Sequence, residues 1–354
     1  MSVMRGHEEI FQVVRHEILS GKFDADKRLP SESALAERFG CSRPTISRVT
    51  LDLKREGLIA TRKGAPSMVT RYALNATGAL GLVVPGESYT EIFKPIISSL
   101  SRMVEQAGWD LIQGEIKSEK PSVRAREARR LAYRFSKEHV AGVFFHPLEL
   151  IANATRANEE AISYFENAGI AVVLLDFDIL LPPGRSRYDM VGIDNLSAGL
   201  AVGRHLLGKG AKRIAFNMRA HAAATVMIRM TGVMEAVVES GREWSRRNVL
   251  VADPGNVRAV SRFLNSFRPD AIVAWNDVGA VHLRETLHKI GGGAEKIRLA
   301  GFDDVAAAEE AGITTVRQPL GDLASTALQT LISRIKSPEL PPRTILLHAP
   351  LIVR

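Results

Sequence analysis

The sequence predicts an α/β protein in which a small N-terminal winged helix-turn-helix domain precedes a larger domain built on parallel sheets. Three observations lead to this expectation. Residues 29–56 have the capping residues and apolar spacing of two helices joined by a tight turn. From residue 79 onward, short apolar runs alternate with helical patterns, which is typical of parallel strands covered by helices. The number of these units favours two sheets side by side.

The first helix of the turn motif is expected to begin after Ser31, whose hydroxyl can accept a bond from a free N–H of the first turn. Gly40 can end this helix because glycine adopts a left-handed conformation without a steric penalty. Ser42 can cap the second helix in the same way as Ser31. Helical spacing then places three apolar residues of the second helix on one inward face: Ile46, Val49 and Leu53. An earlier amphipathic helix carries Ile10, Val13, Val14 and Ile18.

The outward face of the second helix carries basic and hydroxyl side chains near its N-terminal end: Arg43, Thr45, Ser47 and Arg48. Such groups suit phosphates and base edges in a major groove of DNA. Residues 57–61 and 67–70 read as two strands, and Arg62, Lys63 and Gly64 form the turn between them, as in a wing beside a recognition helix. The alternative is a surface helical hairpin with ordinary solvated charges.

Composition agrees with a DNA-binding protein of the reducing cytosol. The chain has 354 residues, 45% apolar content and a net charge of +8, and residues 1–76 hold 13 basic and 9 acidic side chains. Half of the excess charge therefore lies in about a fifth of the chain, which supports phosphate contacts. The single cysteine, Cys41, cannot form an internal disulfide and is expected to be a packing residue. The first residues lack the apolar core of a secretory signal, and no run reaches the roughly 18 apolar residues of a membrane helix.

The larger domain is predicted as a series of strand and helix pairs. The expected strands are 79–85, 109–112, 140–145, 170–176, 190–193, 213–216, 248–251, 271–275, 297–301 and 314–316. The expected helices are 93–107, 123–138, 156–168, 197–209, 228–240, 256–267, 277–290 and 320–335. One of these helices carries a basic run, interpreted as a solvated face: Arg124, Arg126, Arg129, Arg130 and Arg134.

Polar side chains follow several of these strands, at the ends where parallel sheets bind ligands. Asp176, Asn276–Asp277 and Asp303–Asp304 each come directly after an apolar run, and Arg229 lies near the start of a helix. Carboxylate, amide and guanidinium groups together both donate and accept hydrogen bonds, as a hydroxyl-rich ligand requires. The alternative is that Asp277 and Asp304 cap helices or hold loops and that Arg229 pairs with a structural carboxylate.

The run from Leu29 to Thr45, LPSESALAERFGCSRPT, resembles the signature of the GntR family of winged helix-turn-helix proteins. Ser33 and Ser47 stand where that family often has arginine, and 64–69 departs from its usual wing, so we expect a different preferred DNA sequence. The resemblance implies DNA contacts by residues of both helices and of the wing turn: Ser31, Glu32, Ser42, Arg43, Thr45, Ser47, Arg48, Arg62, Lys63 and Gly64.

Residues from about Thr77 onward resemble the LacI family, whose core shares the fold of periplasmic sugar-binding proteins. The likeness is carried by Val191–Asn195, Lys212–Phe216, Arg229 with Gly232, Gly301–Asp304 and Thr314–Pro319. It implies effector contacts by four residues, Asp176, Arg229, Asn276 and Asp303, with Tyr89, Phe93 and His146 as further candidates. It also implies these boundaries: 1–70 for the DNA-binding domain, 71–77 for the linker, and 78–354 for the effector domain, with lobes 78–178 plus 317–340 and 179–316 plus 341–354.

A GntR-type head on a LacI-type body resembles the arabinose-repressor type of bacterial regulator. The resemblance implies a homodimer on a two-fold DNA operator, released by a sugar effector, with a nucleobase as the alternative. Sequence motifs of common enzyme classes are absent, and the nine histidines lack metal-ligand spacing, so we expect no catalysis, metal or cofactor. A transport-linked binding protein is a third option, disfavoured by the DNA-type head and by the lack of a signal peptide.

Overall fold

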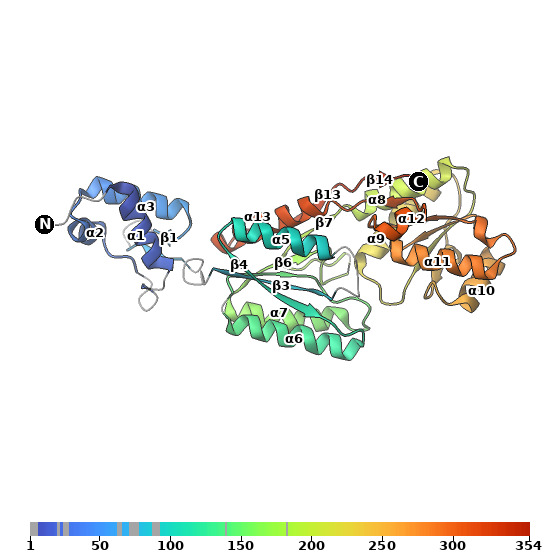
Figure 1. The fold of residues 1–354 in the computed structure, drawn as a ribbon, viewed down its shortest axis with the longest axis horizontal. Coiled ribbons are helices and arrows are strands. Elements are labelled where there is room, and N and C mark those ends of the chain that lie inside the picture. The colour runs from blue at the N-terminus through green and yellow to red at the C-terminus, as the bar shows by residue number, and fades with distance from the viewer. Residues whose placement is uncertain are drawn as a thin grey trace.

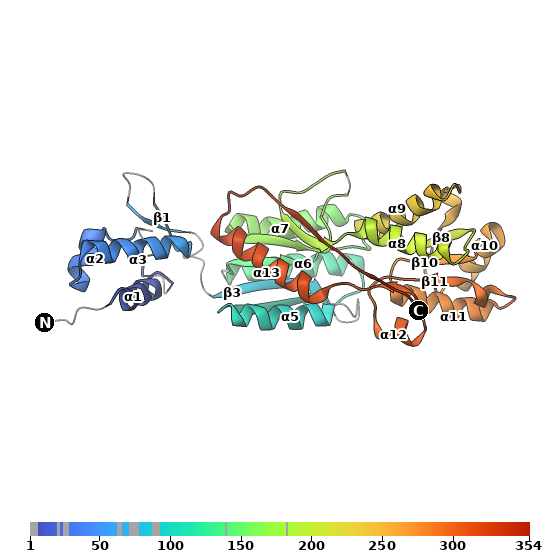
Figure 2. The same cartoon turned by 90° about the horizontal axis from the view of Figure 1, so that it is seen from above.

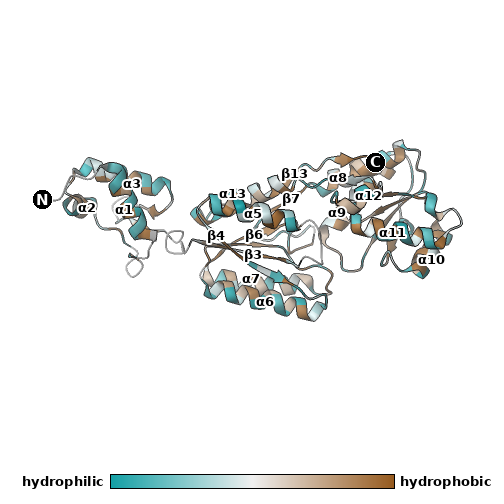
Figure 3. Ribbon diagram, viewed as in Figure 1, coloured by the Kyte–Doolittle hydropathy of each residue, from teal (hydrophilic) through white to brown (hydrophobic). Residues whose placement is uncertain are grey.

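The chain forms a small helical head followed by two α/β lobes arranged along one axis (Figure 1). A computed structural model describes residues 6–19, 22–23, 28–61, 66–70, 78–86, 93–138, 140–181 and 183–354. Apolar strands lie inside each lobe, and the helices turn their polar faces outward (Figure 3). No helix in these ranges is long and apolar enough to span a membrane.

The head has the helix-turn-helix and two-stranded wing that the sequence predicts. Its elements are α1 (His7–Leu19), α2 (Glu32–Phe39), α3 (Arg43–Arg55), β1 (Ile59–Ala60) and β2 (Met68–Val69). Strands β1 and β2 pair antiparallel. The Ser31 hydroxyl accepts a bond from the Ala34 N–H (3.2 Å), and Gly40 ends α2 with φ +62°. Both caps were predicted from sequence and are confirmed.

The core of the head is formed by the apolar faces of its three helices. Ile10, Val14 and Ile18 of α1 pack with residues of α2 and α3, including Leu35, Phe39, Ile46, Val49 and Leu53. An ion pair between Glu17 and Arg38 joins α1 to α2, with Nη1 to Oε2 at 2.7 Å. This pair lowers the pKa of Glu17 to about 2.

The first lobe contains a six-stranded sheet in which every pairing is parallel. Its order is β13 (Thr344–Leu347), β7 (Asp189–Ile193), β6 (Ala171–Leu175), β5 (Gly142–Phe145), β3 (Ala79–Pro85) and β4 (Asp110–Ile116). Alternate residues of β3 point to opposite faces: Leu80, Leu82 and Val84 pack with one helix layer, and Ala79 and Val83 pack with the other.

Helices cover both faces of this sheet, as parallel strands require. One layer holds α5 (Phe93–Gln106) and α13 (Leu320–Lys336), and the other holds α6 (Pro121–Lys137) and α7 (Ala154–Ala168) (Figures 1 and 2). Helix α13 follows the second lobe in sequence but packs on the first, so the chain returns to this lobe after building the other.

The second lobe contains a four-stranded parallel sheet with the order β11 (Arg298–Ala300), β10 (Ala271–Ala274), β8 (Ile214–Met218) and β9 (Val249–Val251). Its helices are α8 (Asn195–Gly208), α9 (Ala224–Glu239), α10 (Val257–Phe267), α11 (Asp277–Ile290) and the short α12 (Ala306–Glu310). Strands β12 (Thr315–Val316) and β14 (Leu351–Ile352) pair antiparallel beside this lobe. Short 3₁₀ turns occupy 246–248 and 294–296.

The predicted lobe boundaries need a correction at two strands. The sequence-based division put 179–193 and 341–354 in the second lobe, but β7 and β13 pair with each other in the first sheet. The chain crosses between the lobes near 194, 317–319 and 348–350. Alternating strand and helix patterns do not say which sheet a strand joins, because strand pairing is decided by contacts between distant segments.

A buried carboxylate joins the three elements that meet at the base of the first lobe. Asp189 of β7 is fully buried, and it pairs with Arg334 of α13 (2.9 Å) and Arg343 before β13 (3.0 Å). The Arg343 N–H also donates to it at 2.7 Å. Although burial opposes ionisation, these partners hold the pKa of Asp189 below its usual value. Asp189 therefore anchors the returning segments to the sheet.

Candidate functional site

The outward face of α3 presents the side chains that the sequence predicted for DNA contact. Ser42 caps the helix by accepting a bond from the Thr45 N–H (3.4 Å). Arg43, Ser47 and Arg48 are exposed, and Thr45 is half-buried. The Arg43 guanidinium donates to the Ser33 hydroxyl of α2. Ser31 and Glu32, at the start of α2, are also exposed, so all the predicted helix residues lie on the surface of one motif.

The wing is described in part. Strands β1 and β2 form its base, with Ile59 opposite Val69 and Ala60 opposite Met68. The predicted contacts Arg62, Lys63 and Gly64 lie outside the described residues, as does the predicted linker 71–77.

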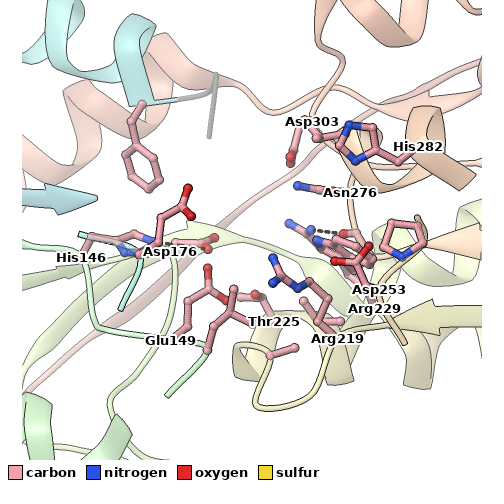
Figure 4. A pocket seen from close by; sticks show the side chains of 18 of the residues that line it. His146, Glu149, Asp176, Arg219, Thr225, Arg229, Asp253, Asn276, His282 and Asp303 are labelled. Atoms are coloured by element: carbon pink, nitrogen blue, oxygen red, sulfur yellow. Dashed lines mark hydrogen bonds and ion pairs between the residues drawn. The ribbon is translucent and has the colours of Figure 1, made fainter. Parts of the chain in front are cut away.

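A cavity of about 540 Å³ lies between the two lobes, at the carboxyl ends of their strands (Figure 4). Six of the predicted effector residues line it: Phe93, His146, Asp176, Arg229, Asn276 and Asp303. They come from the start of α5, the ends of β5, β6, β10 and β11, and α9. The seventh, Tyr89, lies outside the described residues. The volume of the cavity is in the range of small-molecule sites.

Asp176 projects into the cavity from a strained turn after β6. Its φ is +72°, and its N–H donates to the Val191 carbonyl at 2.8 Å. Gly192 makes this turn possible, because a Cβ at that position would lie 2.5 Å from the Asp176 carbonyl oxygen. Burial raises the pKa of Asp176, and the charge of Arg229 opposes the rise. The carboxylate accepts no hydrogen bond from the described protein, which leaves its oxygens available to a ligand.

His146 lies beside Asp176, with Nε2 at 4.0 Å from Oδ2. Only 3% of His146 is exposed, and the rings of Phe93 and Phe177 pack edge-on to it at 4.6 and 5.2 Å. Burial, together with the nearby Arg124 charge, lowers the pKa of His146 to about 3. The imidazole is therefore neutral at physiological pH and forms part of an apolar wall with Phe93.

Arg229 is the central cation of the second lobe's wall. It is 5% exposed, its Nε donates to Asn195 (2.7 Å), and its Nη1 donates to the Trp275 carbonyl (2.8 Å). The guanidinium also stacks over Phe302, 4.7 Å from the ring centre. Close packing of α8 on α9 positions it: a Cβ on Gly199 would lie 2.1 Å from the Arg229 carbonyl oxygen.

The remaining predicted residues of this wall are Asn276 and Asp303. The side-chain carbonyl of Asn276 caps α11 by accepting a bond from the Gly279 N–H (2.8 Å). The NH₂ group of the same side chain is left to face the cavity (Figure 4). Asp303 has φ +115° and accepts a bond from the Gln318 amide (2.6 Å). Burial raises the pKa of Asp303 to about 6, although Arg229 and Gln318 oppose the rise.

The neighbouring acids, Asp277 and Asp304, make structural contacts instead of lining the cavity. Asp277 is fully buried outside the cavity, where it accepts bonds from the Thr315 hydroxyl (2.7 Å) and the Val305 N–H (3.1 Å). Burial, with the Asp303 charge, raises the pKa of Asp277 to about 7. Asp304 pairs with Arg317 and Arg354 and so ties the last residues to β12. The structural alternative weighed for both residues is therefore the one observed.

The cavity has further polar residues that the sequence did not predict as effector contacts: Glu119, Arg124, Glu149, Arg219, Thr225, Asp253, His282 and Gln318. Arg124 was assigned to a solvated helix face, but it is 3% exposed and donates to the Glu149 carbonyl oxygen (2.6 Å). It occupies the first turn of α6, beside the carboxyl end of the sheet. That position, three residues after Pro121 at the start of the helix, is the signal that could have separated it from its exposed neighbours such as Arg126.

Glu149 also joins the two lobes. Its carboxylate accepts a bond from the Ala223 N–H of the second lobe (3.0 Å), and the Leu150 N–H donates to the His221 carbonyl (2.8 Å). Leu150 and His221 both have φ +57°. Burial, with the nearby Asp176 charge, raises the pKa of Glu149 to about 7. These two bonds form an interlobe contact at the edge of the cavity.

No group of three or more metal-ligating side chains occurs within the described ranges. A helix-turn-helix head joined to two lobes that enclose a polar cavity defines a class of protein: ligand-responsive regulators that bind DNA. Comparison with known proteins agrees with this class. Residues 7–69 match the family of bacterial regulatory proteins named gntR, and residues 204–354 match the periplasmic binding protein-like domain.

Curated relatives and solved structures resemble most of the chain. The arabinose metabolism transcriptional repressor of Geobacillus stearothermophilus is 24% identical over 90% of this chain and 88% of its own. The transcriptional repressor PurR of Vibrio vulnificus is 24% identical over 82% of this chain and 84% of its own. The structure of a transcriptional regulator CelR–cellobiose complex superposes with a TM-score of 0.66 at 21% identity, covering 92% of this chain and 99% of its own.

The chain is a DNA-binding transcriptional regulator that joins a gntR-family head to a periplasmic binding protein-like effector domain.

Proposed function

We propose that this protein is a repressor that leaves its DNA operator when a sugar occupies the cavity between the lobes. The observation that carries the proposal is the cavity itself. It sets carboxylate, guanidinium and amide groups of both lobes around one small-molecule volume, in a chain whose head exposes a recognition helix. The names of two similar proteins, an arabinose metabolism repressor and a cellobiose-bound regulator, support a sugar as the effector.

On the DNA side, we propose that the N-terminal half of α3 enters the major groove. Arg43 and Arg48 would contact phosphates or guanine edges, and Thr45 and Ser47 would add hydroxyl contacts. Ser31 and Glu32 at the start of α2 would contact the DNA backbone, as would Ser42 in the turn between α2 and α3. Arg62, Lys63 and Gly64 of the wing would contact the phosphates beside the recognition helix.

On the effector side, we propose that Asp176 and Asp303 accept bonds from sugar hydroxyls, while Arg229 and Asn276 donate to sugar oxygens. Phe93 and His146, together with Tyr89, would cover one face of the ring. Because these groups come from both lobes, a sugar that bonds to all of them favours the closed arrangement of the lobes.

Helix α13 offers a route from the cavity to the head. Gln318, two residues before this helix, bonds to Asp303 in the cavity wall. Lys336, its last residue, lies against the head, since a Cβ on Gly57 would be 3.3 Å from the Lys336 Cγ. A ligand that moves the Asp303–Gln318 pair therefore acts on a helix whose far end contacts the turn after α3. By linkage, the operator weakens effector binding as much as the effector weakens operator binding.

We further propose that the protein acts in the cytoplasm, as a homodimer on a two-fold operator and without catalysis. Two heads on half-sites about one helical turn apart, or a multiple of it, match the usual geometry of helix-turn-helix dimers. A homodimer supplies that symmetry.

Replacing Asp303 by Asn tests the proposal. The variant keeps the shape of the side chain but removes a carboxylate that accepts from Gln318 and faces the cavity. In a gel-shift assay we expect unchanged operator binding and release that needs at least about 30-fold more sugar, because charge-assisted bonds are worth about 2 kcal/mol. Unchanged release would remove Asp303 from the site. Loss of DNA binding together with release would indicate misfolding.

A further inference from the structure

The cavity carries an excess of acid in a basic protein. The chain has a net charge of +8. Among the described residues that line the cavity, however, five carry carboxyl groups and three carry guanidinium groups: Glu119, Glu149, Asp176, Asp253 and Asp303 against Arg124, Arg219 and Arg229. The local charge therefore opposes that of the molecule as a whole.

The two buried guanidinium groups are already engaged by the protein. Arg229 donates from two of its nitrogens, to Asn195 and to the Trp275 carbonyl, and stacks on Phe302. Arg124 donates to the Glu149 carbonyl at 2.6 Å. A bidentate site for phosphate or carboxylate needs two free parallel donors on one guanidinium. These bonds use two of the five N–H groups of Arg229, one on Nε and one on Nη1, so its side-on pair of parallel donors is no longer free.

Three carboxyl groups of the cavity wall, by contrast, accept few bonds from the protein. Asp176 accepts no hydrogen bond from the described residues, Asp303 accepts one from Gln318, and Glu149 accepts one from Ala223. An ionised carboxylate can accept about four bonds. The carboxyl groups of the cavity therefore keep most of their acceptor positions unused, which suits a ligand that donates from several hydroxyl groups.

Electrostatics point the same way. Burial raises the pKa values of Asp176, Asp303 and Glu149, and charges within the group raise two of them further: Asp176 acts on both Glu149 and Asp303. The nearby Arg124 and Arg229 only partly compensate. An anionic group placed among these carboxyls would add repulsion in a site with reduced access to water.

We infer that the cavity takes a polyhydroxyl effector with no anionic group, and that it discriminates against the phosphorylated and the acidic forms of the same sugar. This inference rests on the proposed function and specifies the chemical class of its effector. The aromatic side chains of Phe93 and Trp275, which also line the cavity, suit the C–H faces of an uncharged sugar ring.

The guanidinium of Arg219, in the described lining of the cavity, could attract an anionic ligand. It is exposed and has no hydrogen bond or ion pair within the described chain. Its exposure weakens its attraction for an anion, because water and salt screen exposed charges. An Arg219→Gln variant isolates its contribution.

The experiment is a titration of the full-length protein, followed by tryptophan fluorescence, because Trp275 lines the cavity. The probes are D-glucose, D-ribose and L-arabinose, each compared with its terminal phosphate and its acid derivative at equal ionic strength. We expect binding by at least one neutral sugar and at least 30-fold weaker binding by both of its charged partners. Asp176→Asn should reduce the difference in affinity between the neutral sugar and its charged forms, because it removes one carboxylate without changing the shape of the cavity wall.

A charged form that binds as tightly as its neutral partner would overturn the inference, most directly if Arg219→Gln abolished that binding. The proposed function would then stand, provided that the charged ligand releases DNA in a gel shift. A neutral sugar that binds with the expected preference but leaves the operator bound would contradict the proposed function alone. A panel in which no compound binds would overturn both the inference and the sugar effector.

Discussion

The candidate DNA-binding face of the head draws its helix residues from one stretch, Ser31–Arg48, whereas the cavity draws its lining from loops and helices between Phe93 and Gln318. In the head, helix periodicity and two serine caps decide which side chains point outward. In the cavity, each functional side chain depends on partners far away in sequence. Arg229, for example, is held by Asn195 and by the Trp275 carbonyl.

This difference teaches where each site is vulnerable. A change at one position of the head should alter DNA contact or local helix stability and leave the lobes intact. A change at a buried junction of the lobes should affect the whole effector domain. All three tryptophans, Trp109, Trp244 and Trp275, lie in the effector domain, so their fluorescence reports on that domain separately from the head.

The largest effect is expected for Asp189→Ala. Removing this fully buried carboxylate leaves two guanidinium groups, those of Arg334 and Arg343, without their counter-ion and removes the ion pairs that tie α13 and the start of β13 to β7. We expect the effector domain to lose about 3 kcal/mol of unfolding free energy. Urea denaturation followed by tryptophan fluorescence measures it. Glu17→Gln, which breaks an ion pair of the head, should leave this transition unchanged. A loss below about 1 kcal/mol would contradict the anchoring role of Asp189.

Glu149→Gln should have a pH-dependent effect on the same transition. The pKa of Glu149 is raised to about 7 in the fold, so wild-type stability decreases as pH rises from the normal glutamate pKa through 7. Gln keeps an acceptor for the Ala223 N–H but cannot ionise. We expect the variant to match wild type at pH 5 and to be more stable by about 2 kcal/mol at pH 8. Equal stability of the two proteins at both pH values would contradict burial of an ionised Glu149.

Arg43→Ala should weaken operator binding by at least about 1 kcal/mol, which is fivefold or more, because it removes an exposed guanidinium from the start of α3. Gel shifts at two salt concentrations measure the loss and the change in salt dependence. Arg126→Ala, an exposed arginine of α6, is the matched control and should bind DNA as wild type does. Effector affinity should not change in either variant. If Arg43→Ala binds the operator normally, Arg43 does not contact DNA.

The smallest effect is expected for Ser31→Ala, which removes the bond from the Ala34 N–H at the start of α2. Loss of a helix cap costs about 1 kcal/mol. Amide hydrogen exchange in α2 should therefore be faster, while the tryptophan transition of the lobes stays the same. Ser31→Asp keeps a capping oxygen and should restore slow exchange. A shift of the tryptophan transition would show that head and lobes unfold together.

Much of the fold followed from local pattern. The predicted strand at 79–85 and helix at 277–290 have the observed bounds, because continuous apolar runs and N-caps such as Asn276 are local signals. Six candidate effector residues line one cavity because the carboxyl ends of parallel strands meet at one edge of a sheet. Contact of these residues with an effector stays a prediction, as does contact of the head residues with DNA.

The missed features are long-range. Arg124 has the same residue type and helix as its exposed neighbours, and only the adjacent loop that carries Glu149 makes it a cavity residue. Strand β13 was not predicted at all, because its alternating burial at one edge of the sheet gives a weak signal in four residues.

The sequence by itself determined the helix-turn-helix, its caps, the order of strands and helices, and the polar residues that follow the strands, since each depends on neighbours a few positions away. Only the tertiary structure decided which sheet β7 and β13 join, that Glu149 bonds across the lobes to Ala223, and that Arg229 is held by Asn195 and the Trp275 carbonyl. These depend on contacts between segments many residues apart, which local periodicity does not encode.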